Sequence, residues 1–244
     1  MPAFTIRIGN AIVEIHARHD YVQKACAPYM CELEPTHRIV IDESLIQSER
    51  KKALKVNAGR ELTPSEISDW FLEYYALLHK ILEILPECNM LFMHGSAIKF
   101  DDKGYIFVAP SGTGKSTHTR IWTERYGDEV TVINDDKPFL SFADNKVFIH
   151  GTPWRGKHNI GHNITAELAG ICILVRGERN TIKQLYGVDA VTDIIAQCNL
   201  HHYGNNTFKA LDLIDQLLQN VPVYYLTCTP TMEAAEVCHD FLIK

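Results

Sequence analysis

Alternating hydrophobic and polar residues open the chain, a pattern typical of β-strands with one buried face. Phe4, Ile6 and Ile8 alternate with polar residues, and Gly9-Asn10 separates them from a second alternating run, as in a β-hairpin. Within residues 1–60 we predict a hairpin over 4–15, a short helix over 20–30 and a strand over 37–42. Residues 43–60 are polar and fit no single element. The first 60 residues are therefore expected to form a small α/β lobe.

Apolar residues at helical spacing mark the next segment. Thr63-Pro64-Ser65-Glu66 has the form of a capping box with proline at the first helical position, and Pro86 ends the apolar pattern that follows. These signals predict a helix over 64–85. Its broad apolar face is expected to belong to the core, and a partner-binding surface is the alternative.

Strand and helix patterns alternate through the rest of the chain. We predict strands over 90–100, 104–108, 129–133, 139–142, 146–150, 171–175, 183–186 and 221–228, and helices over 117–126, 189–198, 207–218 and 230–242. The sequence therefore predicts an α/β protein in two parts. The first part is the N-terminal lobe over 1–60 and the second is a domain over 61–244. The lobe could be a separate unit or continuous with the core of the second part.

A glycine-rich turn joins the expected strand 104–108 to the helix that follows, and it has the pattern of a P-loop. Gly112 and Gly114 let the backbone bend until its N–H groups converge on an anion, Lys115 can reach the outer phosphates, and the Ser116 hydroxyl suits Mg²⁺. Ala109 stands where the strict pattern has its first glycine. The residues expected to contact a nucleoside triphosphate are Ser111, Gly112, Thr113, Gly114, Lys115, Ser116 and Thr117.

Two carboxylates, Asp135 and Asp136, end the expected strand 129–133. In an open sheet, ligands bind at the edge where such strands end. Adjacent side chains of an extended strand diverge, so one carboxylate can hold a metal ion while the other faces an incoming hydroxyl. The alternative is a polar turn at the strand end with no chemical role.

A glycine-rich loop over residues 151–161 carries Arg155, Lys157 and His158. Arg155 is the candidate for stabilising charge on a phosphoryl group during transfer. The loop could instead hold an anionic substrate or lie on the surface without a role.

Composition excludes several classes of protein. The net charge is −6 and no block of basic residues occurs, which argues against nucleic-acid binding. The start of the chain lacks a signal-peptide pattern, and no apolar run approaches the roughly 20 residues needed to span a bilayer. The seven cysteines form no C-x-x-C pair, which fits reduced thiols. We therefore expect a cytoplasmic protein with no membrane or nucleic-acid partner.

Three motifs in order resemble those of a known family. His94-Gly-Ser-Ala, Ser111-Gly-Thr-Gly-Lys-Ser116 and Ile133-Asn-Asp-Asp136 resemble the catalytic core of HPr kinase/phosphorylase. They are also similar to the nucleotide core of ATP-dependent phosphoenolpyruvate carboxykinase. The resemblance covers residues 93–137 and implies a P-loop kinase fold with a mixed sheet, in which His94 lies near the metal ion.

The resemblance implies an ATP-dependent kinase that uses Mg²⁺, or Mn²⁺ in its place, to phosphorylate a hydroxyl group. The acceptor would be a serine of a protein or peptide, or a small alcohol. Asp135 would be the base and Asp136 the metal ligand beside Ser116, and the two adjacent carboxylates could exchange these roles. HPr kinases form oligomers, so a homo-oligomer is among the expectations. The alternatives are an ATP-binding regulator without catalysis and a small carboxykinase-like enzyme.

Overall fold

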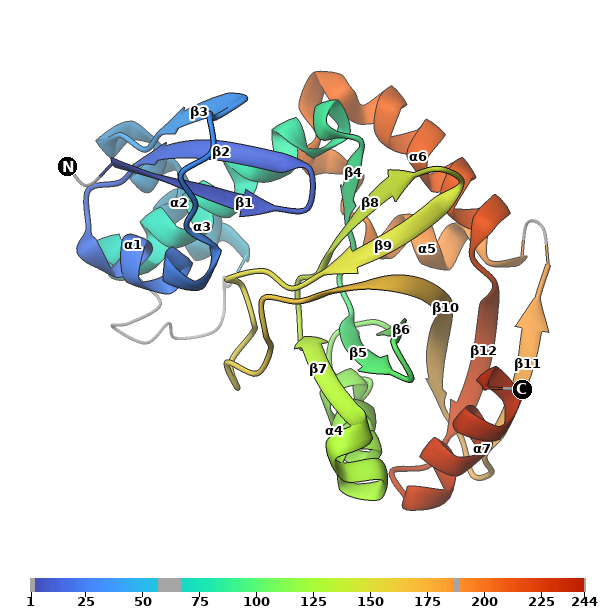
Figure 1. Cartoon of the computed structure of the whole chain (residues 1–244). Helices are drawn as coiled ribbons and strands as arrows, with labels where there is room; N and C mark the ends of the chain where they lie inside the picture. The colour runs from blue at the N-terminus through green and yellow to red at the C-terminus, as the bar shows by residue number, and fades with distance from the viewer. Residues whose placement is uncertain (1–2, 57–66, 187–188, 244) are drawn as a thin grey trace.

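The computed structural model describes residues 3–56, 67–186 and 189–243, and Figure 1 shows the whole chain. Its N-terminal part is built on a small three-stranded sheet of β1 (Ala3–Ile8), β2 (Ala11–His16) and β3 (His37–Val40). β1 and β2 are antiparallel and turn at Gly9, whose φ of 55° favours glycine, whereas β2 and β3 are parallel. The predicted hairpin and third strand are confirmed.

Helices cover this small sheet, as the blue and cyan part of Figure 1 shows. They are α1 (Asp20–Cys26), which continues as the 3₁₀ turn η1 (Ala27–Tyr29), then α2 (Glu43–Val56) and α3 (Asp69–Ile84). The fully buried Glu73 of α3 accepts hydrogen bonds from the backbone N–H groups of Arg18 and His19, and its carboxylate also lies 2.6 Å from His19 Nδ1. The apolar face of α3 packs in the core as expected. The predicted capping box over 63–66 lies outside the described residues.

The second sheet has nine strands of mixed direction, in the order β4-β8-β9-β10-β6-β5-β7, with β12 also paired to β10 and β11 to β12. The strands are β4 (Met90–Phe92), β5 (Ser96–Phe100), β6 (Lys103–Val108), β7 (Val130–Asn134), β8 (Phe139–Ala143), β9 (Lys146–His150), β10 (Thr165–Arg176), β11 (Thr181–Leu185) and β12 (Val223–Cys228). The helices that accompany it are α4 (Lys115–Tyr126), α5 (Val191–Gln197), α6 (Thr207–Asn220) and α7 (Met232–Leu242), with short 3₁₀ turns η2 (Leu85–Cys88), η3 (Gly127–Glu129), η5 (Leu200–His202) and η6 (Gly204–Asn206). The prediction of a mixed α/β protein with an N-terminal α/β extension is confirmed at this level. No helix of the described residues is long and apolar enough to cross a membrane.

One element prediction was wrong, and one segment for which no element was predicted is helical. Residues 90–100 do not form one strand, because the chain breaks at Met93–Gly95; β4 then pairs with β8, whereas β5 pairs with β6 and β7. Residues 43–56, which fit no pattern, form the helix α2, whose few buried positions pack on α3. One cluster of buried side chains includes residues of both sheets, and the division at residue 60 stays a prediction.

The strand directions determine which residues meet at one edge of the large sheet. β5 is antiparallel to both β6 and β7, so β6 and β7 end at the edge where β5 begins. Three segments therefore converge there, namely the glycine loop after β6, the Asp135-Asp136 pair after β7 and His94 just before β5. The candidate site is built at this edge.

Candidate active site

The glycine loop, residues 109–114, connects β6 to α4. Gly112 and Gly114 have φ values of 79° and 124°, a region that side chains other than glycine rarely adopt. Lys115 is largely buried, and its ammonium group donates a hydrogen bond of 2.9 Å to the Ala109 carbonyl across the loop. Burial lowers the pKa of Lys115, and the nearby Asp136 and Asp135 oppose that shift. The loop is thus closed around a lysine that faces two carboxylates.

The turn after β7 is formed by Asn134. Its fully buried amide oxygen accepts hydrogen bonds from the backbone N–H groups of Asp136 at 2.9 Å and Lys137 at 2.7 Å. Its amide nitrogen donates to the carbonyl and the hydroxyl of Thr152. The side chain of Asn134 therefore makes the polar turn at the strand end, and both aspartate side chains line the cleft.

Asp135 lies on the side of the glycine loop. It is 7% exposed, and its Oδ1 accepts a hydrogen bond of 2.7 Å from the buried Ser96 hydroxyl. Because that bond uses the only proton of Ser96, the 2.5 Å contact between Ser96 and Thr119 requires Thr119 to donate. Burial raises the pKa of Asp135, and hydrogen bonds from Ser96 and Ser116 oppose that shift. Asp135 is thus held beside the first turn of α4.

Asp136 faces the other way. One carboxylate oxygen lies 3.3 Å from His94 Nε2, and the other pairs with Lys137. Burial raises the pKa of Asp136, but the hydrogen bond from His94 and the charge of Lys137 outweigh burial and hold this pKa at about 2. The Asp136 side chain keeps 20% of its surface exposed. It is therefore an ionised carboxylate that an incoming molecule can contact.

The loop over 151–161 folds back on the end of β7. The backbone N–H of Asp135 donates to the carbonyl of Ile160 at 3.2 Å, and Asn134 bridges to Gly161. Gly156, with φ of 67°, lies so close that a Cβ there would come within 3.0 Å of the Asp136 Cβ. The loop thereby brings Lys157 and His158 to the two aspartates.

Arg155 does not line the cleft, in contrast to the expectation from sequence. It lies beside the buried Tyr29, whose pKa is raised because burial outweighs the opposing effect of Arg155. The Nε of Arg155 is buried and has no hydrogen-bond partner among the described residues. The reason is local, because the loop turns at Gly156 and directs the residues on its two sides differently. The neighbouring cation Lys157 occupies the position expected for Arg155.

Together these segments enclose a cleft of about 430 Å³ at the sheet edge. It is lined by His94, Ser111, Gly112, Gly114, Lys115, Ser116, Thr117, Asp135, Asp136, Gly156, Lys157 and His158. Of the residues named from sequence, all except Thr113 and Arg155 therefore line one cleft. The described residues contain no group of three or more His, Cys, Asp or Glu side chains that could hold a metal ion. The buried Asp135 carboxylate beside the Ser116 hydroxyl does fit Mg²⁺, which prefers oxygen ligands and takes only one or two from protein.

Sequence reasoning missed three residues that position this site. Ser96 and Asn134 stood within the recognised motifs, but nothing in their neighbours showed that one would bind Asp135 and the other would form the turn. Arg176, at the end of β10, donates hydrogen bonds to the carbonyls of Gly112 and Thr113 and fixes the glycine loop from outside. A contact between residues more than 60 positions apart cannot be predicted from a local pattern in one sequence.

Comparison with known proteins gives a distant structural likeness only. No family model matches the sequence, and no curated protein matches it. Among solved structures, this chain is similar to the Hpr(Ser) kinase/phosphatase from Coxiella burnetii, with 10% sequence identity and a TM-score of 0.38. The match covers 62% of this chain and 95% of the Coxiella burnetii chain. No residue role is transferred from that enzyme.

Proposed function

We propose that this protein is a Mg²⁺-dependent phosphotransferase that moves the γ-phosphate of ATP to a hydroxyl group. One observation carries the proposal: a glycine loop with its lysine and two differently held carboxylates line the same cleft. The loop and helix α4 supply N–H groups for the phosphates, and Lys115 supplies a positive charge. The two aspartates supply a metal ligand and a base.

Asp135 and Ser116 are the proposed ligands of Mg²⁺. The two side chains are hydrogen-bonded to each other, and Ser116 lies in the first turn of α4, beside the glycine loop that would hold the phosphates. When bound, Mg²⁺ would neutralise charge on the β- and γ-phosphates. This assignment exchanges the two roles first given to the aspartates, and the contacts of each carboxylate are the reason.

Asp136 is the proposed base. Its low pKa keeps it ionised, its side chain is more exposed than that of Asp135, and His94 holds one of its oxygens. The acceptor hydroxyl would give its proton to Asp136 as its oxygen bonds to the γ-phosphorus and the bond to ADP breaks. His94 would keep the Asp136 carboxylate in position and would offset part of its negative charge through their hydrogen bond.

Lys157 is the proposed cation for the moving phosphoryl group. It is exposed, lines the cleft and sits next to Gly156, which packs against Asp136. A cation in this place would offset negative charge that develops during transfer. The acceptor would enter between this loop and His94.

The experiment compares Asp135→Asn with Asp136→Asn. Calorimetry would measure Mg²⁺-ATP binding, and γ-labelled ATP would show transfer to cell metabolites and proteins. Asp135→Asn should weaken Mg²⁺-ATP binding and recover in part with more metal or with Mn²⁺. Asp136→Asn should bind normally and transfer label roughly 10²- to 10⁴-fold more slowly. If both variants bind and transfer like the parent protein, the phosphotransferase proposal is wrong.

A further inference from the structure

A second cleft, of about 460 Å³, opens on the opposite side of the glycine loop. It shares Gly112, Gly114 and Thr117 with the first cleft, but its other walls come from the ends of β10 and β12 and from α4. β10 and β5 flank β6 on opposite sides, so the two clefts lie on either side of the loop that follows β6. A molecule held on the loop by its phosphates can therefore extend into either cleft.

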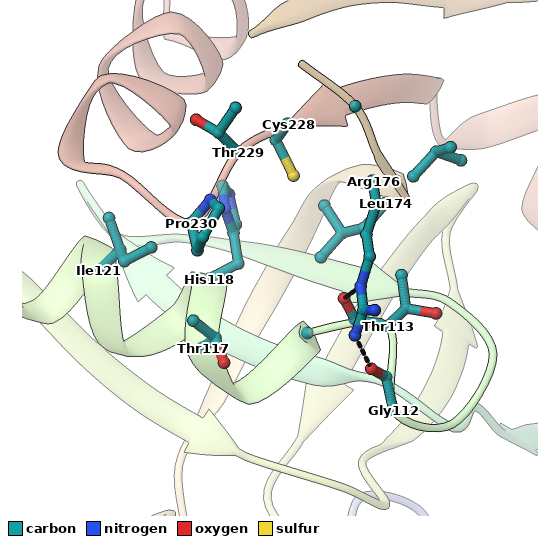
Figure 2. A pocket seen from close by; sticks show the side chains of 13 residues that line it. Gly112, Thr113, Thr117, His118, Ile121, Leu174, Arg176, Cys228, Thr229 and Pro230 are labelled. Carbon is teal, nitrogen blue, oxygen red and sulfur yellow. Dashed lines mark hydrogen bonds between the residues drawn. The ribbon is translucent and has the colours of Figure 1, made fainter. Parts of the chain in front are cut away.

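The walls of this second cleft are mainly apolar. Ile121 of α4, Leu174 of β10 and Pro230 before α7 face it from different elements, as Figure 2 shows. Its size is that of a small-molecule site, which typically combines apolar walls with a few placed polar groups. The first cleft, by contrast, is lined with charged groups. A triphosphate fits the first cleft and an uncharged ring fits the second.

Among the described residues, one buried side-chain atom at this second cleft has no hydrogen-bond partner. His118 of α4 is 3% exposed and lines the cleft, and its ring points from α4 toward Pro230. The indole N–H of Trp122 donates a hydrogen bond of 3.1 Å to His118 Nε2, so Nε2 must be the unprotonated nitrogen of a neutral ring. Burial lowers the pKa of His118 to about 3, which keeps the ring neutral.

The tautomer follows from that bond. With Nε2 accepting from Trp122, the proton of His118 sits on Nδ1, and Nδ1 has no hydrogen-bond partner in the described residues. An unpaired buried donor costs free energy, and a ligand that supplies an acceptor would remove that cost. His118 thus holds an N–H donor without a partner, buried at the apolar wall of the cleft.

We infer that the second cleft is a nucleoside site that holds a purine base, with His118 Nδ1–H donating to an unprotonated ring nitrogen. This inference rests on the proposed function, since it places the base of the nucleotide whose phosphates lie on the glycine loop. Arg176 lines the same cleft and is tied to the carbonyls of Gly112 and Thr113, so it marks the passage from base to phosphates. His118 then determines which base binds tightly.

The experiment compares Mg²⁺-ATP with Mg²⁺-tripolyphosphate, which lacks base and sugar, by calorimetry. ATP should bind at least about tenfold more tightly, because burial of about 60 Å² of ring surface is enough for that factor. His118→Phe keeps a ring beside Phe107 but has no donor, and it should weaken ATP by roughly 3- to 10-fold while tripolyphosphate binds as before. The matched control Trp122→Phe keeps His118 but removes the hydrogen bond that fixes its proton on Nδ1. ATP affinity should then fall by only about twofold.

Analogues of ATP that lack one ring nitrogen identify the acceptor. One of 1-deaza-, 3-deaza- and 7-deaza-ATP should bind the parent protein roughly 3- to 10-fold more weakly than ATP and should bind His118→Phe as well as ATP does. Cys228, half-buried in the same cleft, gives a second readout: ATP should slow its alkylation and tripolyphosphate should not.

Two different failures can be told apart. If tripolyphosphate binds and ATP binds no more tightly, or if His118→Phe leaves ATP affinity unchanged, the nucleoside site is wrong and the phosphate site stands. If neither ATP nor tripolyphosphate binds the parent protein, the proposed function itself fails.

Discussion

Two buried histidines, His118 and His150, should make the stability of the folded protein depend on pH. Burial lowers the pKa of His118 to about 3 and that of His150 to about 4, and the charge of Arg7 adds to the effect on His150. Both nitrogens of His150 are occupied, by Ser141 and Thr165 at 2.8 Å each. Both rings are therefore neutral in the folded state at pH 5, whereas a histidine of the unfolded chain titrates near 6.5.

The sign of the effect follows from proton binding. Below pH 6.5 the histidines of the unfolded state bind protons, whereas those of the folded state do not. The free energy of unfolding therefore keeps its full value above this pH and falls as the pH drops toward the folded pKa values. Between pH 6.5 and pH 5 the difference is 1.5 pH units, and at about 1.36 kcal/mol per unit each histidine costs about 2 kcal/mol. The two together should cost about 4 kcal/mol, which is a large part of the stability of an ordinary domain.

Guanidinium denaturation followed by tryptophan fluorescence, repeated from pH 7.5 to pH 5, measures this loss. His118→Phe and His150→Asn should each remove about 2 kcal/mol of the pH-dependent drop, whatever they do to stability at pH 7.5. Ser141→Ala removes a hydrogen bond to His150 but no titrating group, so it should lower the free energy of unfolding at every pH and leave most of the drop. A drop of unchanged size in both histidine variants would refute the reasoning.

Further predictions concern the cleft with the two aspartates. Lys115→Ala should weaken Mg²⁺-ATP by roughly 10- to 100-fold in calorimetry, because the glycine loop has no other buried cation, and unchanged affinity would mean that the loop is only structural. Lys157→Ala should lower kcat by roughly 10²-fold, and Arg155→Ala should affect it much less; the opposite order in steady-state assays would return the role to Arg155. Ser96→Ala should lower the free energy of unfolding by about 1 to 3 kcal/mol in denaturant titrations, since it leaves Thr119 without its acceptor, and an unchanged midpoint would contradict the hydrogen-bond chain.

Local patterns predicted most of the elements correctly, because the strands alternate or carry β-branched residues and the helices keep an apolar stripe. The break between β4 and β5 was not predicted, because Met93 is as buried as the strands and only Gly95 marks the bend. α2 escaped because it lies half exposed and buries few side chains.

The candidate residues were also found from local spacing, but their contacts were not. The order of the motifs placed Lys115, Asp135 and Asp136 at one sheet edge, as the structure has them. Whether a given carboxylate faces Ser116 or His94 depends on Asn134 and on a loop that returns 20 residues later, and such geometry is set by tertiary packing.

The loop over 151–161 is anchored at its ends and free in its middle. Gly151 donates to Ile164 at 3.0 Å, and a Cβ on Gly151 would collide with the backbone of His162, while Ile160 holds Asp135. The exposed tip over 156–159 has no such backbone ties to the sheet. The loop is thus tolerant of change at some tip positions and not at others: a substitution of Asn159, which does not line the cleft, should leave the carboxylates in place, whereas a side chain at Gly156 would push against Asp136.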